Sequence, residues 1–309
     1  MIMYVGLTDW AWYQFLAARS PGEVNFWRPS SKQAFSALAP GELFLFKLHA
    51  PRRAIVGGGF FVKYTRLPVS LAWMAFGPDN GEPDREALGQ AVLSYRKTSG
   101  VGPEPDPEIG NIVLTQPFFF EPSDWIPEPP DWNPATQQGK RYDTASTAGS
   151  WLWAEVADRL TRMGLEPFQD ATPDGAPADH VRAWALRRLG QGGFRVLVTD
   201  AYRRQCAVTG EHTLPVLEAA HIRPVAREGS HEVRNGLLLR ADLHILFDRG
   251  YVTLDEDYRF VVSPRLEAEY HNGRDYYART GHRILLPAAV ADHPAPELLA
   301  WHRQHVFVA

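Results

Sequence analysis

Cysteine is almost absent from this sequence, with Cys206 as the single one in 309 residues. One cysteine cannot form an internal disulfide or a two-cysteine zinc site, so we expect no structural zinc. No apolar run approaches the roughly 18 residues of a membrane-spanning helix, and residues 1–12 lack the basic and apolar regions of a secretory signal. These absences favour a reducing, cytoplasmic setting without a membrane partner.

The sequence also lacks an overall excess of basic charge. Its net charge is −4, which by itself does not indicate a nucleic-acid binder. The charge is unevenly distributed, because residues 181–250 contain 11 arginines, no lysine and 7 Asp or Glu residues. Arginine suits phosphate because its planar guanidinium offers paired donors, although a solvated basic surface is the simpler alternative.

Apolar runs separated by glycine and proline predict an α+β fold with two domains. The first domain is expected at residues 1–130, with strands at 43–48, 54–62, 69–76 and 112–114 and a helix at 85–97. Nine prolines between residues 103 and 134 predict an extended connector, and residues 131–150 are the expected linker. The second domain is expected at 151–309, with helices at 151–163, 180–189 and 195–202.

Three segments between residues 206 and 250 combine side chains that suit phosphodiester chemistry. We expect a strand at 216–222, a loop at 224–233, a short apolar stretch at 237–239 that pairs back or leads into a helix, and a helix at 241–248. His244 and Asp248 share one helix face, where an imidazole and a carboxylate can hold a divalent ion. His221, brought opposite, could activate a water, and hydrolysis needs both a base and a cation.

The order His221, Asn235, His244 in a strand–loop–helix frame resembles HNH, or ββα-metal, endonucleases. The motifs around these residues are similar to those of a bacterial subgroup of restriction-type HNH nucleases. There, a Cys-Ala-x-Thr-Gly segment precedes an acidic-Ala-Ala-His-Ile strand, and an Asn-Gly-Leu-x-Leu stretch precedes a His-x-x-Phe-Asp helix. The upstream Arg188–Gly192 segment and Phe194-Arg195 also resemble that subgroup. The likeness covers residues 185–262, the expected core of an HNH nuclease domain.

The resemblance implies that His221 is the general base and that His244 is a metal ligand. Asn235 either binds the metal or braces the loop that carries His221. Asp248 stands where many members of the family place a second histidine or another helix ligand. The resemblance therefore implies catalytic roles for His221, Asn235 and His244.

One departure from the family concerns the residue directly before the base. Many HNH sites have an aspartate or histidine ligand there, whereas this sequence has Ala220. Glu218 has the same strand parity and is the candidate replacement; the alternative is an ion that keeps more water and phosphate oxygens. We expect Mg²⁺ because it accepts several waters, although Mn²⁺ or Ni²⁺ would suit the imidazole better. Phosphate contacts are expected from four arginines around the site: Arg195, Arg223, Arg234 and Arg240.

Residues 1–115 are rich in aromatic side chains, with clusters at residues 10–13 and 25–29 and a two-strand pattern with a glycine-rich bend at 40–61. This layout resembles the PUA-like superfamily of small β-barrels, which includes the SRA, EVE and YTH readers of modified bases. In that superfamily an aromatic pocket accepts a flipped base. The resemblance implies a pocket in which three tryptophans stack and three polar residues read the base edge: Trp10, Trp27, Trp73, Asn25, Asp9 and Lys47. The simpler alternative is that these tryptophans belong to the barrel core.

The combined expectation is a modification-dependent DNA endonuclease of phage defence. The first domain would read 5-methylcytosine or 5-hydroxymethylcytosine in double-stranded DNA, and the second would cleave with a divalent metal. A homodimer is plausible because one site cuts one strand at a time. Two alternatives stay open at this point: an HNH nuclease without modified-base reading, and a non-catalytic nucleic-acid-binding protein with a vestigial HNH fold.

Overall fold

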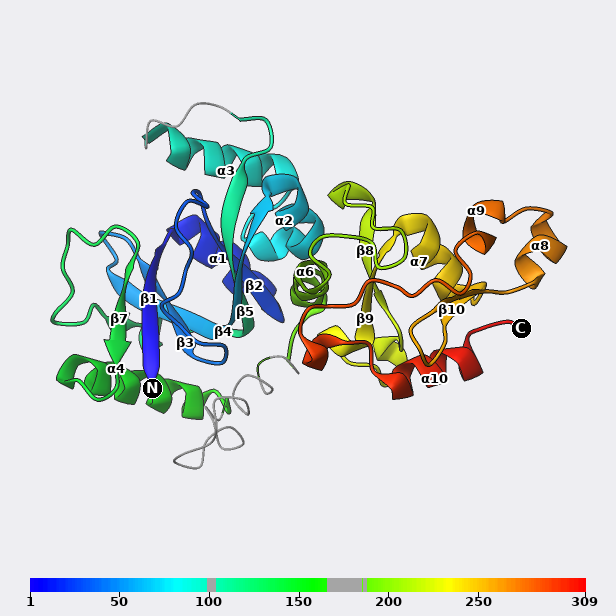
Figure 1. The fold of residues 1–309 in the computed structure, drawn as a ribbon. Coiled ribbons are helices and arrows are strands. Elements are labelled where there is room, and N and C mark those ends of the chain that lie inside the picture. The colour runs from blue at the N-terminus through cyan, green and yellow to red at the C-terminus, as the bar shows by residue number, and fades with distance from the viewer. Residues whose placement is uncertain (99–103, 166–184, 186–187) are drawn as a thin grey trace. The chain divides into compact units, whose positions relative to one another are not determined.

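The structure is a computed structural model that describes residues 1–98, 104–165, 185 and 188–309. The chain divides into two compact units, Met1–Gly193 and Phe194–Ala309 (Figure 1). The boundary therefore lies later than the linker predicted at residues 131–150. The reason is that helix α4, Thr147–Arg162, packs its apolar side chains into the core of the first unit. The helix predicted at 180–189 falls largely outside the described residues.

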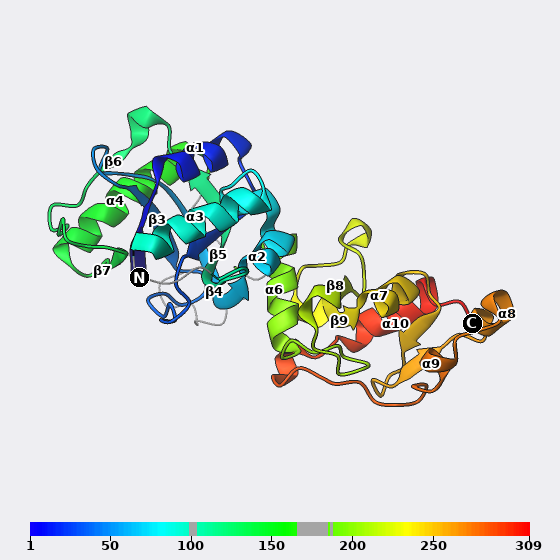
Figure 2. The same cartoon turned by 90° about the horizontal axis from the view of Figure 1, so that it is seen from above.

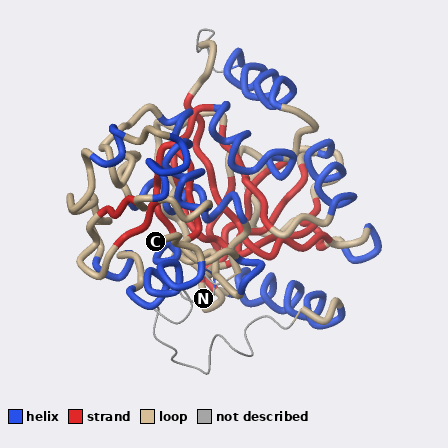
Figure 3. Tube along the Cα trace, turned by 90° about the vertical axis from the view of Figure 1, so that its right-hand side faces the viewer, coloured by secondary structure: helices blue, strands red, loops and turns tan. Residues whose placement is uncertain are grey.

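The first unit is built on one mixed sheet. Its strands are β1 (Ile2–Thr8), β2 (Glu23–Arg28), β3 (Leu43–Leu48), β4 (Ala54–Pro68), β5 (Glu108–Phe119), β6 (Ile126–Pro127) and β7 (Gly139–Asp143). Their order is β2-β5-β4-β3-β1-β7, with β6 paired to β4, and only the β1–β3 pair is parallel among the described strands. The mixed α+β class is confirmed (Figure 3). The predicted barrel closure is not found: β2 and β7 end the hydrogen-bonded path and do not pair within the described residues.

Two hydrophobic clusters lie on the two faces of this sheet. Along β3, Phe44 and Phe46 belong to one cluster, while Leu43 and Leu45 belong to the other, as the alternation of side chains in a strand requires. Helix α1 (Trp10–Arg19) contributes to the first cluster and α4 contributes to the second. Strand β4 can run close to β5 because Gly57 has no side chain. A Cβ at this position would come within 2.2 Å of the β5 backbone.

Helices α2 (Val69–Phe76) and α3 (Arg85–Thr98) complete the first unit, with short 3-10 turns at Gly77–Asn80 and Pro122–Asp124. The helix predicted at 85–97 is confirmed, but the strand predicted at 69–76 is wrong, because that segment is α2. Its buried residues are Val69, Ala72 and Phe76, which follow helical rather than alternating spacing. A short apolar run carries no signal that separates a buried strand from a buried helix.

The second unit is organised around a hairpin and a helix. Strand β8 (Leu217–His221) pairs antiparallel with β9 (Gly236–Arg240), which leads directly into α7 (Ala241–Asp248). The apolar stretch at 237–239 therefore pairs back. Between the two strands, a loop contains the 3-10 turns Val225–Arg227 and Val233–Asn235. A small second sheet follows, made of β10 (Val252–Leu254) and β11 (Phe260–Val262).

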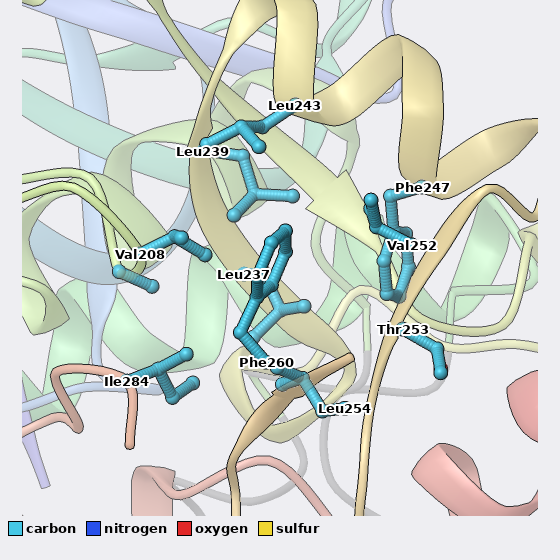
Figure 4. Close-up of a pocket in the computed structure, with 11 residues that line it drawn as sticks. Val208, Leu237, Leu239, Leu243, Phe247, Val252, Thr253, Leu254, Phe260 and Ile284 are labelled. Atoms are coloured by element: carbon cyan, nitrogen blue, oxygen red, sulfur yellow. The ribbon is translucent and has the colours of Figure 1, made fainter. Parts of the chain in front are cut away.

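The helix α7 is fixed by an apolar core that it shares with both sheets. Figure 4 shows Leu237 and Leu239 of β9, Leu243 and Phe247 of α7, and Phe260 of β11 gathered in this core. The remaining helices are α6 (Gln191–Ala201), α8 (Arg265–Tyr270), α9 (Arg274–Tyr277) and α10 (Pro296–His305), with 3-10 turns at Leu214–Val216 and Val290–Asp292. Helix α10 packs against β10, and its His302 contacts Phe247 near the end of α7 (both helices are labelled in Figure 2).

No helix among the described residues has both the length and the apolar character needed to cross a membrane.

Candidate functional site

His221 ends strand β8, and its imidazole lies flat against a buried phenylalanine. The Phe194 and His221 ring centroids are 3.8 Å apart with an interplanar angle of 10°. Gly236 pairs with His221 across the hairpin and permits this stack, because a Cβ on Gly236 would come within 3.0 Å of the Phe194 ring. Burial, and then the charges of His231 and His244, lower the pKa of His221 to about 4. The imidazole is therefore uncharged at neutral pH and able to accept a proton.

A second histidine contacts the first. His221 Nε2 lies 3.1 Å from His231 Nδ1, and the two rings meet edge to face. Burial also lowers the pKa of His231. Sequence reasoning assigned His231 to a loop and missed both this pairing and the Phe194 stack. No local signal could have revealed them, because the contacts depend on how α6 and the 222–235 loop fold back on β8.

Asn235 is fully buried and holds the two ends of that loop together. Its Oδ1 accepts a hydrogen bond from the Arg223 backbone N–H, and its Nδ2 donates to the carbonyls of Arg223 and Ser230, at 2.8 to 2.9 Å. Its own carbonyl accepts from the Ile222 N–H. Because the side-chain amide is engaged by loop backbone on both atoms, the geometry favours the bracing role for Asn235 over the ligand role.

The expected metal-binding side chains converge on His244. Across the hairpin, Glu218 places Oε2 2.7 Å from His244 Nδ1. One turn along α7, Asp248 places Oδ2 3.3 Å from His244 Nε2. Burial, and the negative charge of Glu218, raise the pKa of Asp248, while the nearby His244 opposes that shift. Both nitrogens of the imidazole therefore face carboxylates.

The donor atoms fit a divalent ion held by a small number of protein ligands. His244 Nε2 and Asp248 Oδ2 are close enough to donate to one ion, and Glu218 is placed as the carboxylate that usually orients a metal-binding imidazole. Within the described part of the chain, no group of three or more His, Cys, Asp or Glu residues is placed to hold a metal ion. Among the described side chains, His244 and Asp248 are therefore the pair that could donate to one ion.

Three of the four arginines expected at phosphate are held by acidic partners. Arg223 pairs with Glu228 at 2.6 Å and lies over the Trp301 ring at 5.4 Å. Arg234 pairs with Glu297 of α10 at 3.0 Å. The guanidinium of Arg240 makes two hydrogen bonds to Asp242, and this raises its pKa further. The fourth, Arg195, is half-buried on α6.

In the first unit, three of the expected base-pocket residues gather around Asn80 and Tyr95. Asn25 donates to the Asn80 side chain at 2.8 Å, and the Trp27 indole donates to the Asn80 carbonyl at 3.0 Å. Tyr95 meets the Trp27 ring edge-on and donates to the Asp9 carboxylate. Asn25 is fully buried, and its Oδ1 accepts no hydrogen bond from the described residues.

The other expected pocket residues are Trp10, Trp73 and Lys47. Trp10 stacks on Tyr13 and lies beneath the guanidinium of Arg52, at 3.9 Å. Trp73 is half-buried on α2. Lys47 is buried, pairs with Glu128 at 2.7 Å and lies over the Trp132 ring, so its ammonium is engaged within the unit. The structure therefore groups Asp9, Asn25 and Trp27, while Trp10 and Lys47 have other partners.

Comparisons with known proteins bear on the second unit most directly. Residues 206–255 match the family model described as HNH endonuclease. No curated protein matches the chain. Among solved structures, the modification-dependent TagI restriction endonuclease aligns with 86% of this chain and 61% of its own, at 14% identity and a TM-score of 0.27. The chain therefore spans less than two thirds of that protein, and the likeness is too low to show a shared fold.

Proposed function

We propose that the second unit, whose residues 206–255 are an HNH endonuclease domain, hydrolyses phosphodiester bonds in double-stranded DNA. The observation that carries the proposal is the half-buried imidazole of His221 at the end of β8, the strand whose Glu218 contacts His244 of the His244–Asp248 donor pair. His244 is near enough for its charge to lower the pKa of His221. A base and a cation-binding pair in one hairpin–helix unit are the two elements that phosphodiester hydrolysis needs.

In the proposed mechanism, His221 accepts the proton of the attacking water. His244 and Asp248 would hold a divalent ion, Mg²⁺ in the first instance and Mn²⁺ or Ni²⁺ as alternatives, with Glu218 as orienting partner or third ligand. The ion would supply positive charge to the phosphate and the leaving oxygen. Asn235 keeps the 222–235 loop closed beneath the base. Arginines around the site would contact neighbouring phosphates: Arg195, Arg223, Arg234 and Arg240.

We further propose that the first unit reads a modified cytosine, either 5-methylcytosine or 5-hydroxymethylcytosine. The cluster of Asp9, Asn25, Trp27 and Tyr95 supports this, because it combines aromatic faces with a buried amide oxygen that lacks a donor among the described residues. A flipped base needs a stacking surface and a few edge contacts. This proposal takes the PUA-like resemblance as a likeness in residue pattern and does not require a closed barrel.

Cleavage of matched plasmids tests the proposal. Unmodified, 5-methylcytosine and 5-hydroxymethylcytosine plasmids would be incubated with Mg²⁺, with Mn²⁺ or with a chelator. We expect metal-dependent cutting that is strongest on one modified plasmid. Equal cutting of all three would leave a nuclease without modified-base reading. DNA binding without cutting in any metal would instead support a non-catalytic binding protein.

The number of subunits on DNA belongs to the same proposal. One HNH site cuts one strand at a time, so a double-strand break by a single protein species requires two sites, and a homodimer on DNA would supply them. Sedimentation of the chain with a duplex that carries one recognition site would detect two copies per duplex. One copy per duplex, together with nicked product, would contradict the dimer.

A further inference from the structure

We infer that His231 fixes the tautomer of His221, so that Nδ1 of His221 is the nitrogen that accepts the proton of water. The inference rests on the proposed nuclease function and adds a positioning residue to that site. It starts from one contact, the 3.1 Å separation between His221 Nε2 and His231 Nδ1. His231 lies in the loop between β8 and β9, ten residues after His221.

The proposed role of His221 as base, together with the nitrogens of the two rings, gives the direction of this hydrogen bond. A neutral imidazole has one N–H donor and one acceptor nitrogen. A general base needs an acceptor nitrogen that is not already bonded, and Nε2 of His221 is engaged by His231. Nδ1 must then carry the lone pair, so the proton of His221 sits on Nε2 and is donated to Nδ1 of His231. Which nitrogen of a histidine is protonated is set by the partner of the other nitrogen.

The surrounding residues hold both rings in this arrangement. Phe194 stacks on His221 with an interplanar angle of 10° and fixes the plane of its ring. Asn235 donates a 2.8 Å hydrogen bond to the carbonyl of Ser230, the residue that precedes His231. The second imidazole is therefore carried on loop backbone that is itself anchored to a buried side chain. Positioning of this kind matters because misplaced catalytic groups lose rate steeply.

The proton balance requires no transfer to His231. When water attacks phosphorus, its proton moves to Nδ1 of His221, and His221 becomes an imidazolium that keeps its Nε2 proton. The hydrogen bond to His231 Nδ1 then becomes charge-assisted and stabilises that cation. His231 contacts neither the water nor the phosphate in this scheme. It acts through His221 and is a positioning residue rather than a catalytic one.

The test compares two substitutions of His231 in the full chain. In His231→Asn, the amide oxygen can replace Nδ1 as acceptor, whereas His231→Ala removes the acceptor. His212→Ala is the matched control, because His212 is an exposed histidine in the same unit. One readout is the tautomer of His221 from ¹⁵N shifts in the metal-free protein, and the other is single-turnover cleavage of the plasmid that is cut best.

We expect the parent and His231→Asn to show the Nε2–H tautomer of His221. In His231→Ala the tautomers should mix, and cleavage should fall about 10- to 100-fold, as when the oriented partner of an active-site histidine is lost. His231→Asn should cleave within a few-fold of the parent. An Nδ1–H tautomer in the parent, or an alanine variant that cleaves like the parent, would overturn the inference.

The two readouts separate this inference from the proposed function. If the parent fails to cleave any DNA but shows a His231-dependent Nε2–H tautomer, the nuclease proposal fails while the tautomer assignment stands. If the parent cleaves and its tautomer is indifferent to His231, the positioning role fails and the nuclease stands. Should His231→Ala fail to fold, the parent and His231→Asn spectra still decide the direction of the hydrogen bond.

Discussion

The imidazole of His221 should stay uncharged far below the pH at which an exposed histidine gains its proton. Its pKa is lowered from 6.5 to about 4, with burial as the largest cause. At roughly 1.4 kcal/mol per pH unit, the shift corresponds to about 3 kcal/mol against the imidazolium, and to less once solvent screening of a half-buried ring is included. At about pH 5.5 roughly 97% of His221 would be neutral, against about 9% for an unperturbed histidine.

Replacing the stacking ring tests the cause of this shift. Phe194 is completely buried against His221, and Phe194→Leu keeps an apolar side chain there while uncovering part of the imidazole. The pKa of His221 should then rise from about 4 towards 6.5. The chain offers a matched control in Phe247, which stacks on His302 at 3.7 Å in the same way. Phe247→Leu should move the pKa of His302 and leave that of His221 unchanged.

The assay is an NMR titration of the histidine ring protons in the metal-free protein, followed by cleavage rates at pH 5.5 and 7.5. We expect a His221 midpoint near 4 in the parent and a higher midpoint in Phe194→Leu. The parent should keep more of its rate at pH 5.5 than the Leu variant does. A His221 midpoint near 6.5 in the parent, or a midpoint that ignores Phe194→Leu, would refute the reasoning from burial.

Three further predictions concern other residues. Asn235→Ala should remove the buried side-chain hydrogen bonds of the 222–235 loop. The free energy of unfolding, measured by urea titration, should fall by about 1–3 kcal/mol, and the cleavage rate should fall as well. Unchanged stability and rate would contradict the bracing role. Burial lowers the pKa of His302 to about 4, so its stabilising effect is complete above pH 6.5 and is lost as the pH falls towards 4. In His302→Gln, the stability of the second unit, measured by hydrogen exchange, should depend less on pH between 6.5 and 4. An unaltered pH dependence would exclude His302 as its source. Trp27→Ala should reduce the preference for modified DNA in a binding assay without lowering cleavage of a plasmid at saturating protein, whereas an unchanged preference would remove Trp27 from the reader.

Features that depend on neighbouring residues in the chain were predictable from the sequence. Four-residue spacing on one helix predicted that His244 and Asp248 share a face, and the structure has their Nε2 and Oδ2 atoms 3.3 Å apart. Strand parity pointed to Glu218 as a replacement for the metal ligand missing at Ala220; the ligand role stays a prediction, and the Glu218 carboxylate contacts His244. The segments around these residues carry strong local patterns, so β8 and α7 lie where they were predicted, whereas the pairing of 237–239 with β8 was one of two alternatives.

Features set by tertiary packing were not predictable. The stack of Phe194 on His221 joins residues of α6 and β8, and it depends on the missing side chain of Gly236. His231 meets His221 because the intervening loop closes on Asn235, and a loop's closure has no periodic signature. The β-barrel predicted for the first unit came from a resemblance to the PUA-like superfamily. The sequences of β2 and β7 carry no pattern that indicates whether these two strands pair.

The most direct test of the central claim is cleavage of an end-labelled DNA duplex by the parent, His221→Ala and His212→Ala proteins, with Mg²⁺ or with a chelator. The duplex should carry the modification that gives the fastest plasmid cutting, and DNA affinity should be measured in parallel. The account predicts metal-dependent cutting by the parent and by His212→Ala, and none by His221→Ala, with equal affinity in all three. Cutting that survives in His221→Ala would contradict it.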